Sequence, residues 1–164
     1  MISRHNLPDE RARPVAHVTC SIFGDHVEPG VWTKYFAIEP DISVVKGKPF
    51  ITPSGRISSH PGRTGVWGCS SRLAIQDKTL DAHIRYLISR LALPREDLPG
   101  LLEKNDATME ILCFWPNYSG DGAPAIDPQL VHIIETSGGT VTVDEYPQKH
   151  RIIGPDGKEK DIWI

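Results

Sequence analysis

The sequence predicts an α+β fold, in which short strands and amphipathic helices follow one another along a single chain. Two observations lead to this prediction. Residues 65–71 alternate with a period of two, so that Trp67, Cys69 and Ser71 share one face of a strand. In the next segment, apolar residues recur at intervals of three and four, as in a helix with one buried face: Leu80, Ile84, Leu87, Ile88 and Leu91.

Length and composition favour one globular domain. The chain has 164 residues, of which 39% are hydrophobic and 24% charged, values that suit a soluble protein with a sizeable core. Residues 1–14 are polar, and we expect them to form a flexible tail. We place a single α+β domain at residues 15–146 and a C-terminal hairpin extension at residues 147–164. The sequence contains neither a signal peptide nor an apolar run long enough to span a membrane, which favours a cytoplasmic location.

The first part of the domain is predicted to contain a strand, a helix and a second strand. Residues 15–23 alternate between apolar and polar side chains, as expected for a half-buried strand. In the helix predicted at residues 28–36, Trp32, Tyr35 and Phe36 lie three and four positions apart, so they form one aromatic face that belongs to the core. Residues 42–45 form a short strand.

The second half continues with helices and strands. Residues 96–105 form a short helix, and residues 108–115 carry apolar side chains on both faces, which indicates a strand inside the sheet. Asp127 and Pro128 begin a further helix, because aspartate caps free amides and proline suits the first helical position. A strand at residues 140–146 closes the domain, and a small hairpin follows it.

In chain order, and leaving out the short helix at residues 96–105, the first six elements have the order of a ferredoxin-like βαββαβ core. They are the segments at residues 15–23, 28–36, 42–45, 65–71, 80–91 and 108–115. We therefore predict such a core, extended by a further αβ unit, with a mainly antiparallel sheet and its helices on one face. The order of the strands within the sheet does not follow from the sequence.

Positive charge is concentrated in one segment. No acidic residue occurs between Ile42 and Gln76, so this segment carries a charge of +5, whereas the rest of the chain carries −8. Within it, residues 46–64 contain three glycines and three prolines without periodicity, as in a functional or mobile loop. The phosphate-binding patterns GxxxxGK[ST] and GxGxxG are absent, which excludes nucleotide binding by those motifs. The predicted binding residues are Lys46, Lys48, Phe50, Arg56, His60, Arg63 and Arg72.

Two functions are compatible with this basic segment. The first is a non-enzymatic protein-binding module whose loop meets an acidic partner, with arginine and aromatic side chains as anchors. The alternative is a binding site for a small anionic ligand, held bidentately by Arg63 and Arg72. Nucleic-acid binding is disfavoured, because the net charge is −3 and no recognised motif is present.

The sequence assigns no catalytic residue, metal or cofactor. Ser70 or Cys69 with His83, and Cys69 with His60, are incomplete pairs, because nothing places a third orienting group beside them. We therefore expect a structural role for His83. The cysteines, Cys20, Cys69 and Cys113, lie far apart without ligand spacing, so we interpret them as small buried apolar residues.

Several short motifs, in order and spacing, resemble the bacterial domain of unknown function 4279 family over roughly residues 15–146. They are Phe23-Gly24-Asp25, Ile38-Glu39-Pro40, Lys46-Gly47, Gly65-Val66-Trp67, Ser70-Ser71, Leu80, His83, Asp127-Pro128-Gln129-Leu130, Gly138 and Val143-Asp144-Glu145-Tyr146. The chain departs from the family pattern at Gly68, in its extended basic loop and in its C-terminal hairpin. The resemblance implies a small cytosolic protein without assigned catalytic residues, for which binding a toxin as an immunity protein is one role.

Overall fold

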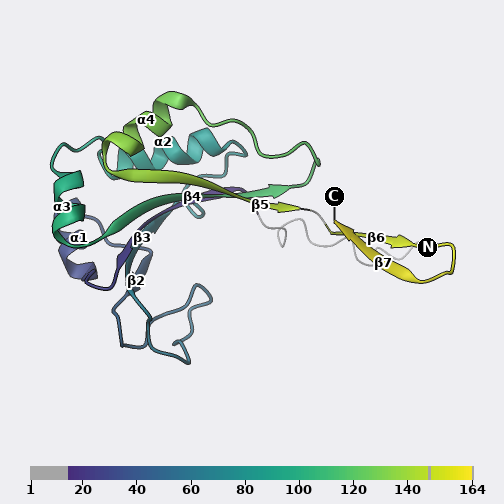
Figure 1. Ribbon diagram of the computed structural model, residues 1–164, viewed down its shortest axis with the longest axis horizontal. Helices are drawn as coiled ribbons and strands as arrows, with labels where there is room; N and C mark the ends of the chain where they lie inside the picture. Colours follow the sequence, from purple (N-terminus) through teal and green to yellow (C-terminus); the bar gives the residue numbers. More distant parts are fainter. Residues whose placement is uncertain (1–14, 148, 164) are drawn as a thin grey trace, which may run out of the picture.

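The structure is a computed structural model that describes residues 15–147 and 149–163 (Figure 1). The tail predicted at residues 1–14 lies outside the described residues. The elements are β1 (His17–Gly24), α1 (Pro29–Phe36), β2 (Ile42–Val44), β3 (Gly65–Ser70), α2 (Leu80–Arg90), α3 (Leu98–Lys104), β4 (Thr108–Asn117), α4 (Pro128–Thr136), β5 (Gly139–Pro147), β6 (Lys149–Ile153) and β7 (Glu159–Trp163). The predicted α+β class is confirmed.

Five strands form one sheet in the order β2-β3-β1-β4-β5. The pairs β2–β3, β3–β1 and β1–β4 are antiparallel, whereas β4 and β5 run parallel. The sheet is therefore mixed and mostly antiparallel, and β4 lies inside it, as its apolar residues on both faces predicted. The strands β6 and β7 form a separate antiparallel pair in the segment where the C-terminal hairpin is predicted.

One face of the sheet forms the core, and the other face is open. In β1, Val18, Cys20 and Ile22 are fully buried, while Thr19 and Ser21 on the opposite face are only half-buried. Figure 1 shows α2 and α4 above the sheet and residues 45–64 below it. The alternation seen in the sequence thus separates a face covered by helices from a face that no described helix covers.

An aromatic cluster joins α1 to β3. Trp32 and Phe36 are buried on the inner face of α1, and the ring of Phe36 stacks on that of Trp67 with centroids 5.0 Å apart. The Trp67 indole N–H also donates a hydrogen bond to Thr33 Oγ1 over 3.0 Å. The aromatic stripe predicted on this helix therefore belongs to the core.

Side-chain caps mark the starts of two helices, one of them the predicted cap at Asp127. Thr79 Oγ1 accepts a hydrogen bond from the Ala82 amide at the start of α2, and Asp127 caps α4 by accepting from the Gln129 amide over 2.9 Å. Within residues 15–147 and 149–163, no helix is both long and apolar enough to span a lipid bilayer.

Candidate functional site

Residues 46–64, which we call the basic hairpin, form an ordered structure that projects from the sheet. At its base, the Gly47 amide donates to Gly62 O over 2.8 Å, and the Gly62 amide donates to Lys48 O over 2.9 Å. Further out, the Ser58 amide donates to Phe50 O over 2.8 Å. The sequence indicated a functional or mobile loop, and these bonds show that its two arms are paired.

A tight turn closes the tip of the basic hairpin. The Thr52 amide donates to Arg56 O over 2.8 Å, and the Thr52 hydroxyl donates to the same carbonyl over 3.0 Å. Gly55 takes a φ of 81°, a left-handed conformation that suits glycine. The turn holds the backbone of Arg56 in place, while its side chain is exposed to solvent.

Two exposed isoleucines face each other near the tip. Ile51 and Ile57 are paired in an antiparallel bridge, and they are 71% and 77% exposed. Phe50, which the sequence nominated as an anchor, is instead half-buried, and its amide is tied to Ser58 Oγ over 3.1 Å. The apolar part of this surface is therefore mainly the isoleucine pair, which sequence analysis missed. The pair flanks the turn sequence Thr52-Pro53-Ser54-Gly55-Arg56, a signal for two facing strand positions.

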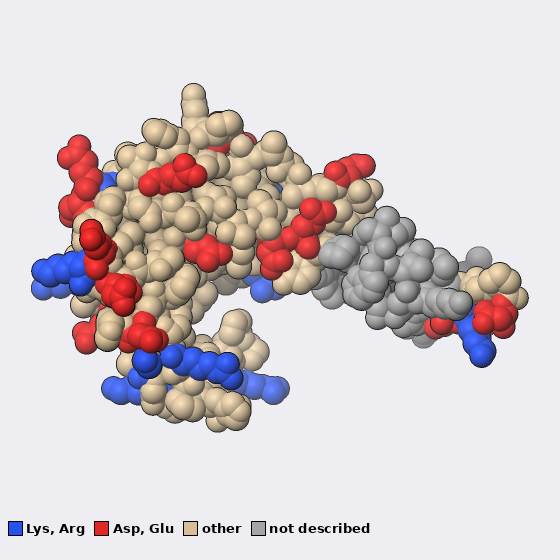
Figure 2. All heavy atoms as spheres, in the orientation of Figure 1, with Lys and Arg blue, Asp and Glu red and all other residues tan. Residues whose placement is uncertain are grey.

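Positive side chains project from the same hairpin as this apolar pair. Figure 2 shows a group of lysine and arginine side chains on the lower projection, with acidic side chains distributed over the body above it. The structure brings six of the seven predicted binding residues together on the basic hairpin: Lys46, Lys48, Phe50, Arg56, His60 and Arg63. All of them except Phe50 are exposed. Lys46 forms an exposed ion pair with Asp25 at 3.3 Å, a contact that contributes little to stability.

Arg72 lies away from this group. Arg63 precedes the start of β3 and Arg72 follows its end. A six-residue strand spans roughly 20 Å, so the two guanidinium groups do not converge on one small anion. The predicted pairing of Arg63 with Arg72 therefore lacks a structural basis, because the strand that the sequence pattern predicts at residues 65–71 separates them as β3.

A shallow groove lies beside the basic hairpin on the open face of the sheet. It has a volume of about 240 Å³, and its lining residues come from β1, β3, β4 and the end of the hairpin: Ser21, Phe23, Thr64, Val66, Glu110 and Leu112. Thr64 belongs to both features, so the groove and the hairpin form one continuous surface. Apart from Glu110, the lining is uncharged.

The buried pair Ser71 and His83 is a structural network. Ser71 Oγ lies 2.6 Å from His83 Nδ1 and accepts a hydrogen bond from the Val18 amide over 2.9 Å, and His83 Nε2 lies 2.7 Å from Asp77 O. A carbonyl only accepts, so Nε2 carries a proton and donates to Asp77 O, while Nδ1 and the Ser71 hydroxyl are hydrogen-bonded to each other. Both side chains have no exposed surface, which leaves no access for a substrate. The serine beside the histidine is thus Ser71 rather than Ser70.

The three cysteines line the core on three adjacent strands. Cys20 pairs in register with Cys69 of β3, and Cys113 lies on the neighbouring strand β4, all fully buried. Burial raises the pKa of Cys69 to about 11 and that of Cys113 to about 12, and it also raises the pKa of Cys20. Among the described residues, no group of three histidine, cysteine or acidic side chains is arranged to hold a metal ion.

These thiols should be unreactive in the native protein. At pH 8 we expect almost no reaction with a thiol reagent such as 5,5′-dithiobis(2-nitrobenzoate), and full reaction of all three once urea unfolds the chain, because only the thiolate attacks the reagent. A rapid native reaction of even one thiol would contradict the buried arrangement.

The raised pKa values of the buried cysteines make the free energy of unfolding depend on pH. Between an ordinary thiol pKa near 9.0 and about 11, the unfolded chain releases thiol protons that native Cys69 retains. Unfolding is then favoured as the pH rises, so the free energy of unfolding should fall over this window. Cys69→Ala should reduce that slope in urea titrations, and an unchanged slope would contradict the assignment.

Comparison with known proteins agrees with the sequence resemblance. The model of the family described as Domain of unknown function (DUF4279) matches residues 14–148, which includes every strand of the main sheet and all four described helices. No curated protein and no solved structure matches the chain. Since the family model covers most of the 164 residues, the chain belongs to the DUF4279 family.

Proposed function

We propose that this protein is a non-enzymatic binding module, and that its basic hairpin docks on an acidic surface of a protein partner. The observation that carries the proposal is the exposed pair Ile51 and Ile57 at the tip of a positively charged projection. Apolar anchors beside arginines are typical of the residues that dominate protein–protein affinity. Isolated apolar side chains are common on surfaces, but here two of them face each other within one charged hairpin.

Charge gives the basic hairpin a means of selecting its partner. Its four lysines and arginines stand on a body in which acidic residues outnumber basic ones. Such separation of charge steers an acidic surface toward the hairpin and raises the association rate. Exposed Arg56 and Arg63 are the principal polar contacts in this proposal, because a guanidinium can hold a carboxylate through two hydrogen bonds.

The pairing within the basic hairpin supports the same function. The backbone bonds between its arms and the turn at Thr52 and Arg56 hold the isoleucine pair in one arrangement before a partner arrives. A surface that is ordered in advance loses less conformational entropy on binding. The proposal thus requires no folding of the hairpin on the partner.

Among the candidate catalytic groups that the sequence offered, His83 and the cysteines are buried in the structure, which supports a binding role. The buried network of Ser71 and His83 is satisfied internally, and the thiols of the core are held in their neutral form. A cytoplasmic immunity protein that neutralises a toxin is the form of this role that the family resemblance implies.

We also propose a ferredoxin-like arrangement for the part of the fold that carries the basic hairpin. The antiparallel order β2-β3-β1-β4, with α1 and α2 in the two connections, supports it. In this arrangement the hairpin is an insertion in the β2–β3 connection, and β5 is an added parallel edge strand.

Site-specific photo-crosslinking tests the proposed function. A benzophenone amino acid placed at Ile57 should cross-link to one protein partner in cells, because position 57 lies in the proposed interface. The matched control carries the same group at Leu73, which is 97% exposed but lies outside the hairpin. Equal patterns of adducts from the two positions, or none from position 57, would contradict the proposal.

A further inference from the structure

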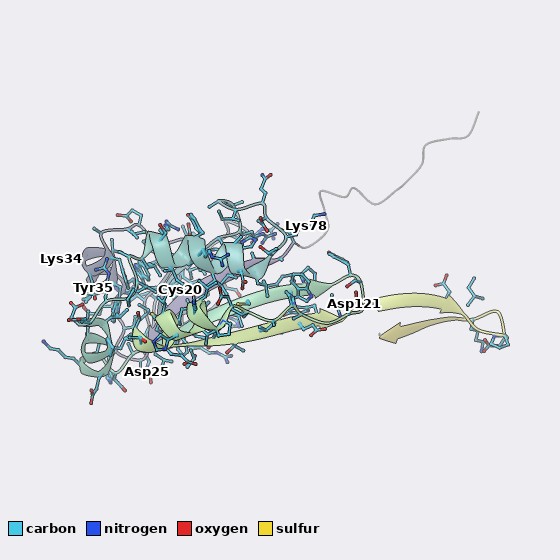
Figure 3. The ribbon with its side chains drawn as sticks, turned by 90° about the horizontal axis from the view of Figure 1, so that it is seen from above. Cys20, Asp25, Lys34, Tyr35, Lys78 and Asp121 are labelled. Carbon is cyan, nitrogen blue, oxygen red and sulfur yellow. The ribbon has the colours of Figure 1, made fainter. Side chains whose placement is uncertain are left out.

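A second concave site lies at the other end of the sheet from the basic hairpin. It is a cavity of about 440 Å³ between the start of β1, the end of β4 and the segment before α2. Its lining surface is mainly apolar, although polar residues also contribute to it; the described lining residues are Val15, Ala16, Gln76, Asp77, Lys78, Trp115, Pro116, Tyr118 and Ser119. Figure 3 shows Lys78 well apart from Asp25, whose ion pair with Lys46 marks the base of the hairpin. The volume and the apolar lining are those of a small-molecule site.

The wall of this cavity contains a polar group without a partner. The indole nitrogen of Trp115 is buried and has no hydrogen-bond acceptor, although the ring lines the cavity. Buried N–H groups are nearly always paired in native proteins, with another protein group, an ordered water or a bound molecule. Trp32 also has an unpaired indole N–H, but this residue is fully enclosed in the core, where no ligand reaches it.

The rim of the cavity carries one acidic and one basic side chain, Asp77 and Lys78. Asp77 accepts hydrogen bonds of 2.7 Å from both the amide and the hydroxyl of Thr79, and these bonds lower the pKa of its carboxyl group. It is therefore ionised at neutral pH, next to the cationic Lys78. One anion and one cation at the entrance favour a neutral ligand over a charged one.

We propose that this cavity binds a small, neutral, mainly aromatic molecule carrying one carbonyl oxygen, which accepts the hydrogen bond of the Trp115 indole N–H. The aromatic part packs on Trp115 and on the apolar side chains around it. A small rotation of the indole ring on ligand entry brings its covered nitrogen to the carbonyl oxygen. This site is independent of the hairpin and of the proposed protein partner.

A matched pair of probes tests the hydrogen bond. Acetophenone and α-methylstyrene have nearly the same shape, but only acetophenone carries a carbonyl oxygen. In titrations followed by the amide resonances of Ala16 and Ser119, acetophenone should bind about threefold to tenfold more tightly, the difference that one hydrogen bond provides. It should also shift the Trp115 indole N–H resonance downfield, while α-methylstyrene should not.

Two variants separate the hydrogen bond from the cavity itself. Trp115→Phe should keep α-methylstyrene binding and remove the preference for acetophenone. Ala16→Phe should fill the cavity and weaken both probes about tenfold, whereas the exposed control Leu73→Ala should bind both as the wild type does. The proposal is overturned if acetophenone perturbs none of these resonances at millimolar concentration. It is equally overturned if the wild type binds both probes alike, or if Trp115→Phe retains the preference.

Discussion

Trp67→Ala should lower the free energy of unfolding by about 3–5 kcal/mol, the range for truncating a large buried aromatic side chain. Trp67 has no exposed surface, and its ring stacks on Phe36 with centroids 5.0 Å apart. The substitution would leave a cavity between β3 and α1 and would leave Thr33 Oγ1 without the indole donor that it accepts from. Urea unfolding followed by circular dichroism measures the change.

Two controls define what this result means. Trp67→Phe keeps a ring against Phe36 but loses the hydrogen bond, so it should cost less than the alanine variant. Leu73→Ala removes a side chain that is 97% exposed, and it should change stability by no more than about 0.5 kcal/mol. If Trp67→Ala were as stable as Leu73→Ala, the assignment of Trp67 to the core would be wrong.

The sequence predicted the elements of this fold well, because each has a strong local pattern. The alternation in β1 and the three- and four-residue spacing in α2 separate buried from exposed side chains before any tertiary contact is known. The apolar residues on both faces of β4 correctly placed that strand inside the sheet. A local capping residue, Asp127, also marked the start of α4.

Features that depend on distant contacts were harder to predict. The parallel pairing of β5 with β4 follows from the crossover through α4, which the order of elements alone did not determine. The pairing of Ser71 with His83 requires both the exact end of β3 and the position of α2. Arg63 and Arg72 were paired because both belong to one acid-free segment, and that pairing overlooked the length of the strand predicted between them, which is β3 in the structure.

The candidate interaction surface was identified in part. Its charge could be read directly from the distribution of lysine, arginine and acidic residues. Its apolar part could not be predicted, because Ile51 and Ile57 are single residues in a segment without periodicity. Only the turn between them places them opposite each other. The same turn converts a segment that was predicted as a functional or mobile loop into a paired hairpin.

The basic hairpin can be tested by reversing its charge. Arg56→Glu with Arg63→Glu should leave the free energy of unfolding within about 0.5 kcal/mol of the wild type, because both side chains are exposed. Binding of the protein that cross-links at position 57 should weaken at least about tenfold at low salt, chiefly through slower association. The matched control, Lys34→Glu with Arg72→Glu, makes the same change in net charge at two exposed positions outside the hairpin.

The most direct measurement compares these two double variants with the wild type by surface plasmon resonance over a salt series. The proposed function predicts that the hairpin variant loses both affinity and salt dependence, while the control variant stays within about twofold of the wild type at each salt concentration. Equal losses in both variants would show that only net charge matters. Undiminished binding by the hairpin variant across the series would show that the interaction surface lies elsewhere.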